Sequence, residues 1–340
     1  MPRIISLLIT VVLSLCSLQA REPMRVLFIG NSYTYCNNLP AIVQSMADEK
    51  KVPMQVESYT EGAMSLRSFL NTLRHAKAAR MLAEGDYDWV ILQDQSQTPA
   101  YNPGDTMGAV ERWCKLAAEQ KTRVMLFLTW AHAHEMNGKV CLQSAMQDDT
   151  SLTYCRAAIA NKATVAPVGE AWRRWYAKHP GKTLHTRDLS HPTAEGSYLA
   201  ACVIYSMLTD TPANKLPTRP GKNAPRINSS AARELQKIAA ATIRNFSPAK
   251  YLKKHEEREA SRPSPEDARQ ALSRGISIEQ LSAKLGKPIA SQKAGSQHTY
   301  QFRLRNKAEL VAYCTPGGIV KKVSIANPGT GVDIIDLDKL

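Results

Sequence analysis

The chain has 340 residues, of which 44% are hydrophobic, and its formal net charge is +14 at pH 7. This length leaves ample chain for a large hydrophobic core and suggests about two domains of roughly 150 residues each. Six cysteines lie beyond residue 20, and their wide spread excludes a disulfide scaffold. No CxxC spacing suggests structural zinc, and Cys141 and Cys155, which flank a polar loop, are the first candidates for a bridge.

Residues 1–20 have the pattern of a secretory signal peptide. Arg3 precedes an apolar run from Ile4 to Leu15, and a short polar end follows. The run is too short for a comfortable membrane span, and no later segment is apolar enough to cross a bilayer. Cys16 follows leucine and not a small residue, so we favour export, to the periplasm or the medium, over lipid anchoring.

Five apolar runs rich in β-branched residues predict strands between residues 22 and 246. They are RVLFIG (25–30), MQVESY (54–59), WVILQD (89–94), RVMLFLTW (123–130) and ATVAPVG (163–169). Helical spacing follows at 39–50, 65–83, 105–120, 150–161, 170–178 and 193–208. Strands that are apolar on both faces and alternate with helices predict an α/β fold, a doubly wound parallel sheet between two helical layers.

Polar residues follow the ends of these runs. In a doubly wound sheet ligands bind at the C-terminal ends of the strands, so these residues share one edge. Ser32 lies at a strand-to-helix corner, and Asp188 and His191 are three residues apart in RDLSH. A serine nucleophile needs a base, and the base needs an acid that fixes its tautomer. We predict these roles for Ser32, His191 and Asp188, although Asp188 alone could equally cap a helix.

A serine hydrolase also needs donors for the oxyanion that forms during attack. The candidates are the backbone N–H groups of Ser32 and Gly62, together with the side-chain amide of Gln95. Glycine at position 62 would let a substrate oxygen approach the main chain closely, although a simple turn glycine is the alternative.

This order of residues resembles the SGNH, or GDSL-like, hydrolase superfamily. The resemblance covers about 220 of the 340 residues and implies a flavodoxin-like three-layer fold with the same roles for Ser32, Gly62, Asp188 and His191. GNSY together with LQDQSQ is similar to an exported bacterial branch of the superfamily. The usual third block is Gly-x-Asn-Asp, whereas this chain has the stretch QDQS at 93–96, so either Gln95 or Gln93 could complete the oxyanion hole.

Further residues at this edge are candidates for a substrate pocket. They are Asn31, Tyr33, Gln93, Trp130 and His132, with packing as the alternative for the aromatic residues and the histidine. His132 and His134 alternate as metal ligands can, but no carboxylate bridge or HxxEH-type spacing accompanies them. We therefore predict neither a metal nor another cofactor.

The composition changes in the second half of the chain. Residues 213–262 contain twelve Lys and Arg against four Asp and Glu. We interpret them as a solvated helix at about 229–246 and a charged linker at 247–263, with attraction to anionic polysaccharide, nucleic acid or membrane as the alternative. No aromatic residues are interleaved in the way that stacks bases, so no nucleic acid partner is expected.

Residues 264–328 predict a small α+β accessory domain, followed by a tail at 329–340. ARQALSRGISIEQLSAKLGKP indicates two short helices, and TYQFRLR, ELVAYCT and GIVKKVSI indicate a three-stranded antiparallel meander. The pattern is similar to the SmpA/OmlA-type lipoprotein domain. That resemblance implies binding or assembly, for example with an envelope partner, and no catalytic role.

These features predict an exported serine esterase that acts on a small-molecule or polysaccharide ester. Short acyl groups, acetyl above all, on glycan hydroxyls are the favoured substrates. A general carboxylesterase or lipase is one alternative, although no exposed Leu/Phe-rich lid segment is present. The other alternative is a non-catalytic glycan- or envelope-binding protein that has the esterase fold but has lost the activity. Gln95, where the superfamily usually has asparagine, is its one supporting feature.

Overall fold

A computed structural model describes residues 22–71, 76–136, 138–219, 221 and 227–340. The predicted signal peptide at 1–20, including Cys16, lies outside the described residues. Residues 220 and 222–226, which belong to the basic stretch at 213–262, also lie outside them. None of the helices in the described ranges combines the length and the apolar character that crossing a bilayer requires.

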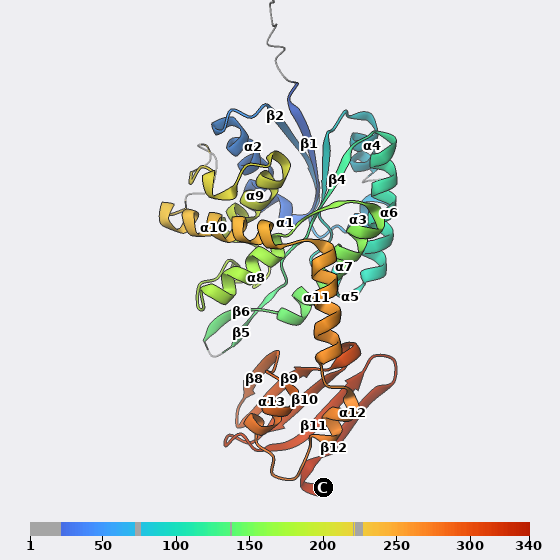
Figure 1. The fold of residues 1–340 in the computed structure, drawn as a ribbon, viewed down its shortest axis with the longest axis vertical. Helices are drawn as coiled ribbons and strands as arrows, with labels where there is room; N and C mark the ends of the chain where they lie inside the picture. Colours follow the sequence, from blue (N-terminus) through green and yellow to red (C-terminus); the bar gives the residue numbers. More distant parts are fainter. Residues whose placement is uncertain (1–21, 72–75, 137, 220, 222–226) are drawn as a thin grey trace, which may run out of the picture.

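A five-stranded parallel sheet forms the centre of the N-terminal domain, in the order β2-β1-β3-β4-β7 (Figure 1). The strands are β1 (Met24–Gly30), β2 (Met54–Thr60), β3 (Trp89–Leu92), β4 (Arg123–Phe127) and β7 (Thr164–Ala166). The chain moves one way from β1 to β2 and the other way through β3, β4 and β7. This reversal beside β1 makes the sheet doubly wound and confirms the predicted fold class.

Helices cover both faces of the sheet (Figure 1). One layer contains α2 (Leu39–Glu49), α8 (Val168–Lys178), α9 (Ala194–Thr209) and α10 (Ser229–Asn245). The other contains α3 (Leu66–Asn71), α4 (Ala76–Glu84), α6 (Pro103–Glu119) and α7 (Ser144–Asn161). The single helix predicted at 65–83 is thus α3 and α4, and residues 72–75 between them lie outside the described ranges.

The alternation of side chains along β1 explains why both faces need a helical layer. Val26 and Phe28 lie in the core under α2 and α9, whereas Leu27 and Ile29 lie in the core under α4 and α6. All four side chains are fully buried. A strand without a polar face cannot be left exposed on either side, so the sheet forms the middle of three layers.

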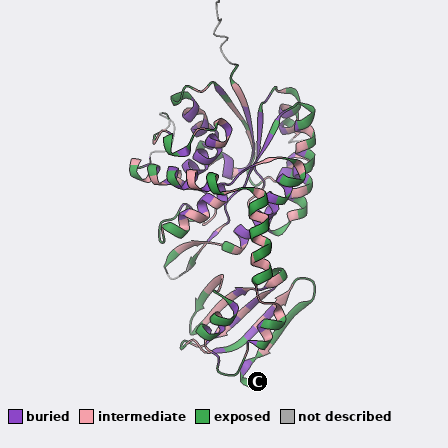
Figure 2. Cartoon of the chain, viewed as in Figure 1, coloured by how far each residue is buried: buried purple, intermediate pink, exposed green. Residues whose placement is uncertain are grey.

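The predicted linker at 247–263 is a helix, α11 (Pro248–Ser261), which begins at the Ser247 cap. Its side chains are exposed or half-buried, and it leads from the N-terminal domain to the C-terminal domain (Figures 1 and 2). The C-terminal domain contains α12 (Pro265–Gln270) and α13 (Ile278–Leu285), each closed at its start by a serine capping box.

The sheet of this domain has two strands more than the sequence indicated. The antiparallel order is β12-β11-β10-β9-β8, with β8 (Ala290–Ala294), β9 (Gln297–Arg303), β10 (Glu309–Cys314), β11 (Val320–Asn327) and β12 (Gly331–Asp336). The added strands β8 and β12 are the two edges. Their side chains are mostly exposed, so they lack the hydrophobic alternation by which a strand is recognised. Residues 329–340 are therefore not a simple tail, and Leu337 is buried in the core of this domain.

The predicted bridge between Cys141 and Cys155 is wrong. All six cysteines of the described ranges are free thiols. Cys155 is buried within α7, whereas Cys141 is half-exposed on the hairpin of β5 (Ala133–Met136) and β6 (Lys139–Leu142). Burial raises the pKa of the Cys155 thiol, which makes it an inert core residue.

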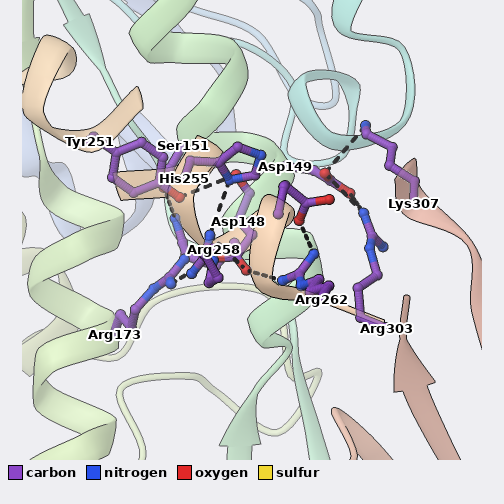
Figure 3. A network of polar contacts seen from close by, with 12 residues as sticks. Asp148, Asp149, Ser151, Arg173, Tyr251, His255, Arg258, Arg262, Arg303 and Lys307 are labelled. Atoms are coloured by element: carbon purple, nitrogen blue, oxygen red, sulfur yellow. Dashed lines mark hydrogen bonds and ion pairs between the residues drawn. The ribbon is translucent and has the colours of Figure 1, made fainter. Parts of the chain in front are cut away.

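Two adjacent carboxylates of α7 join the domains (Figure 3). Asp149 accepts ion pairs from Arg303 at 3.0 Å and from Lys307 at 3.2 Å, both in the C-terminal domain. The partners of Asp148 are the guanidinium groups of Arg173, Arg258 and Arg262. Burial by itself would raise the pKa of Asp148, but these cations hold it below its ordinary value. Asp148 therefore stays charged and fixes α11 to α7, while Asp149 joins the C-terminal domain to the same helix.

Candidate active site

Three side chains at the C-terminal edge of the sheet form one hydrogen-bonded chain. The distance from Ser32 Oγ to His191 Nε2 is 2.9 Å, and that from His191 Nδ1 to Asp188 Oδ2 is 2.6 Å. Ser32 begins the short helix α1 (Ser32–Tyr35) directly after β1, and the other two residues lie in the loop before α9. A hydroxyl, an imidazole and a carboxylate in this order can remove the serine proton and stabilise the resulting imidazolium.

The corner that presents Ser32 is held from below by Asn31 and Gln93. Asn31 Oδ1 accepts a hydrogen bond from the Tyr33 N–H, and Asn31 Nδ2 donates to the carbonyl of Met64. Gln93 Oε1 accepts from the Asn31 N–H at 2.8 Å, and Gln93 Nε2 donates to Asn31 Oδ1 at 2.9 Å. Gln93 is fully buried, with its amide committed to the corner, so it does not compete for the oxyanion.

Gly30 is required at this corner because of the space around it. A Cβ at position 30 would lie 2.4 Å from Thr34 Oγ1 and 2.5 Å from Gln93 Oε1. Thr34 Oγ1 itself donates to Gln93 Oε1 at 2.9 Å. Close packing under the nucleophile thus explains the glycine of Gly-Asn-Ser, and the reaction at the hydroxyl explains the serine.

The Asp188 carboxylate uses its two oxygens for different purposes. Oδ1 accepts hydrogen bonds from the N–H groups of Ser190 and His191 and from the Thr186 hydroxyl, while Oδ2 contacts the His191 ring. Partial burial would raise the pKa of Asp188, but these hydrogen bonds hold it well below its ordinary value. The carboxylate is therefore ionised and fixed before any substrate binds.

The turn that carries the acid and the base is strained. Leu189 has a φ of 61°, in the left-handed region, and its carbonyl accepts a hydrogen bond from Ala133 at 2.8 Å. A non-glycine residue in that region costs roughly 1–2 kcal/mol. The Asp188 hydrogen bonds and the contact with Ala133 offset this cost, and the chain reverses tightly enough for His191 to face Ser32.

Three backbone N–H groups, at the start of α1 and in the loop after β2, are candidates for the oxyanion hole. Within the described residues the N–H groups of Ser32, Gly62 and Ala63 have no hydrogen-bond acceptor. Ala63 has a φ of 60°, and it, not Gly62, lines the pocket beside Ser32. The loop after β2 thus brings two candidate oxyanion donors to the site, of which the sequence indicated only Gly62.

Gln95 lines the same pocket but also caps the next helix. Its Oε1 accepts hydrogen bonds from the N–H groups of Gln97 and Thr98 at the start of α5 (Thr98–Tyr101). Its Nε2 contacts Ser96 Oγ at 3.3 Å. The acceptor end of the amide is thereby fixed, which leaves the donor end for the pocket.

The pocket above Ser32 has a volume of about 260 Å³. Its lining residues are Asn31, Ser32, Tyr33, Tyr35, Ala63, Gln95, Ser96, Ser190 and His191. The sequence did not indicate Tyr35, Ala63 or Ser190. Ser190 lies inside the DxxH stretch that located the acid and base, so position within that stretch is the one signal that could have found it.

Trp130 does not line the pocket. It is 1% exposed and stacks between Tyr33, at 4.5 Å between ring centroids, and Trp172, at 4.0 Å. Its indole N–H donates to the Ser190 carbonyl at 2.9 Å. This stack supports the floor of the site, and the Tyr33 ring at its top packs edge-on against His191. Burial raises the pKa of Tyr33 to about 12, so its hydroxyl remains protonated.

The two histidines after β4 serve different cavities. His132 Nε2 contacts Ser190 Oγ at 3.2 Å and Ser96 Oγ at 3.3 Å, directly behind the catalytic pocket. His134 instead lines a second cleft, between the two domains. Burial lowers the pKa of both rings, so both are neutral near pH 7. Within the described residues no group of three metal-ligating side chains occurs.

Comparisons with known proteins agree with this architecture. A DUF4886 family protein from Bacteroides uniformis is 18% identical, with a TM-score of 0.54 over 66% of this chain and 96% of that one. A provisionally assigned SGNH hydrolase from Slackia heliotrinireducens is 25% identical, with a TM-score of 0.48 over 55% of this chain and all of that one. The N-terminal domain shares the three-layer fold of the DUF4886 family protein, and it is called the SGNH domain below after the resemblance of its motifs.

A third solved structure, an acetyl xylan esterase, is 13% identical to the chain. It aligns with a TM-score of 0.45 over 54% of this chain and 100% of that one. No family model matches the chain, and no curated protein matches it either. At these identities the structural similarity concerns only the fold of the SGNH domain.

Proposed function

We propose that this protein is an exported serine esterase that hydrolyses short acyl esters, acetyl esters in particular, on carbohydrate hydroxyls. The observation that carries the proposal is the continuous hydrogen-bonded chain from Ser32 through His191 to Asp188. A frame that had decayed into a binding protein would have no reason to keep a 2.9 Å contact between the hydroxyl and the imidazole.

In the first half of the reaction His191 Nε2 accepts the proton of Ser32 Oγ as the oxygen attacks the ester carbonyl. Asp188 holds the Nδ1 proton of the ring and stabilises the positive charge that forms on it. The N–H groups of Ser32, Gly62 and Ala63, with the amide of Gln95, receive the oxyanion. Each such donor typically contributes about 3 kcal/mol to lowering the barrier.

In the second half His191 gives its proton to the leaving alcohol, which departs and leaves an acyl group on Ser32. A water molecule then enters, loses a proton to the same ring nitrogen and attacks the acyl carbonyl. Collapse of the second oxyanion releases the carboxylic acid and returns the proton to Ser32. No step calls for a cofactor, because the triad both removes and returns the proton.

The size and polarity of the pocket favour a short acyl group. It has a volume of about 260 Å³, and Ala63 is the one aliphatic residue among those that line it. A long acyl group loses conformational entropy when it binds, and burial in an apolar channel would have to offset that cost. The residues that line this pocket form no such channel. A sugar ester suits it better, because hydroxyl and amide groups of Ser96, Ser190 and Gln95 surround the serine.

The test is hydrolysis of p-nitrophenyl acetate, butyrate and octanoate, and of acetylated xylan, by the mature protein and by Ser32→Ala. We expect activity that falls with acyl length and is lost in the variant. Activity that survives Ser32→Ala would contradict the mechanism. A preference for octanoate would indicate a lipase, and a folded wild-type protein inactive on every ester would favour a binding role.

A further inference from the structure

A second cleft lies between the SGNH domain and the C-terminal domain, and it is larger than the catalytic pocket. Its volume is about 740 Å³. One wall consists of α5, the β5–β6 hairpin and the start of α7, and the other consists of β8, β9 and β10. A cleft of this size accommodates a ligand of several rings, whereas the pocket above Ser32 accommodates an acyl group.

Two segments of the chain lead from the catalytic pocket, or from directly behind it, to the cleft. In the first segment Gln95 and Ser96 face the catalytic pocket, and Tyr101, at the end of α5, lines the cleft. In the second segment His132 contacts Ser96 behind the pocket, and His134 lines the cleft. These two segments are the part of the chain that a polymer with its ester at Ser32 would follow to reach the cleft.

The chemistry of the cleft matches a carbohydrate. Tyr101 is 61% exposed and presents an aromatic face of the kind on which sugar rings stack. Neutral donors and acceptors line the same cleft: Gln143, Ser144, Ser291, Gln292, Thr299 and Gln301. Both ring nitrogens of His134 are buried without a partner among the described residues.

The charge of the cleft selects a neutral polymer. Although the whole chain carries a net charge of +14, the cleft is lined by three carboxylates and one guanidinium. The carboxylates are those of Glu135, Asp149 and Glu309, and the guanidinium of Arg303 is paired with the last two. Lys307 is also paired with Asp149, which leaves a surplus of one negative charge. A polyanion would meet this surplus of negative charge, whereas a neutral polysaccharide would not.

The two walls of the cleft are held in place before any ligand binds. Arg303 and Lys307 of the C-terminal domain are paired with Asp149 of α7, which itself lines the cleft (Figure 3). A preformed site loses less conformational entropy when it binds a flexible polymer.

We infer that the interdomain cleft binds the backbone of a neutral polysaccharide whose acetyl group lies at Ser32, and that the C-terminal domain is a substrate-binding module. This inference rests on the proposed function, because it names the polymer that carries the ester. In this proposal the C-terminal domain supplies one wall of the polysaccharide-binding cleft, and the SGNH domain supplies the other wall.

The test measures binding without turnover. In a Ser32→Ala background, affinities for a neutral panel of xylan, glucomannan and cello-oligosaccharides are compared with those for polyanionic alginate, by affinity electrophoresis and calorimetry. We expect a neutral glycan to bind, and Tyr101→Ala to weaken that binding about tenfold. Gln301→Ala should weaken it as well, whereas the control Gln55→Ala, on the exposed side of β2, should bind as the parent does.

Three outcomes would overturn the inference: no binding to any neutral glycan, binding unaffected by Tyr101→Ala and Gln301→Ala, or a preference for alginate. Because Tyr101 is exposed, its replacement should not disturb folding, which thermal unfolding of each variant checks. Hydrolysis of p-nitrophenyl acetate by the wild-type protein tests the esterase separately. An active enzyme with no glycan affinity would reject the cleft and leave the proposed function intact.

Discussion

At the scale of single residues, Asp188 shows how one side chain serves both the fold and the chemistry. Its Oδ1 closes the turn through two backbone N–H groups, and its Oδ2 orients the His191 ring. The two roles are separable by mutation, because an asparagine keeps the first oxygen and replaces the second with an amide group.

We expect Asp188→Asn to keep the fold and to lose activity. The amide would donate toward Nδ1 and favour the wrong tautomer of His191, so kcat should fall by about 10³–10⁴. Asp188→Ala should lose similar activity and some stability as well, because the turn then lacks its acceptor. Kinetics on p-nitrophenyl acetate and thermal unfolding of both variants measure this, and a loss in kcat of less than tenfold would contradict it.

His185 gives a pH-dependent contribution to stability. It is 1% exposed, contacts the Ala131 carbonyl through Nε2 at 3.0 Å and lies 2.6 Å from the Tyr176 hydroxyl through Nδ1. Burial lowers the pKa of this ring to about 4, whereas an unfolded histidine titrates near about 6.5. Between these values the unfolded chain binds a proton that the folded protein does not, so stability falls as pH falls.

We expect this residue to cost roughly 1.4 kcal/mol of folding free energy per pH unit as pH drops from 6.5 toward 4. Urea unfolding at pH 7, 6 and 5 measures the slope, and His185→Gln should show a shallower one. Equal slopes in the two proteins would show that the ring is not neutral in the folded state.

At the scale of elements, the corner between β1 and α1 depends on close packing under Ser32. We expect Gly30→Ala to destabilise the protein by about 1–3 kcal/mol, because its Cβ would collide with Thr34 and Gln93. The matched control is Gly108→Ala in α6, where a Cβ meets nothing within 4 Å. There we expect a gain of roughly 0.5–1 kcal/mol from the helix. Chemical denaturation measures the free energy of unfolding of both variants. If Gly30→Ala were as stable as the wild-type protein, close packing under Ser32 would not be the reason for glycine at position 30.

At the scale of the whole molecule, the position of the C-terminal domain depends on the carboxylate pair of α7. Asp149→Ala leaves Lys307 without its partner and Arg303 with Glu309 alone. We expect limited proteolysis at α11 to become about tenfold faster, since the lost contacts are charge-assisted. Asp333→Ala, which removes an exposed pair with Arg269, is the control and should change the rate little. Equal rates in both variants would show that other contacts hold the domains.

The sequence by itself determined the doubly wound sheet and pointed to Ser32, Asp188 and His191, because strand periodicity and the order of motifs are local properties of the chain. It did not determine the edge strands β8 and β12, whose exposed residues lack a periodic pattern. Tertiary structure also decided that Gln93 and Trp130 lie beneath the site, that Ala63 and Ser190 line it, and that a cleft separates the two domains. These outcomes depend on how distant segments pack, which no single stretch of sequence encodes.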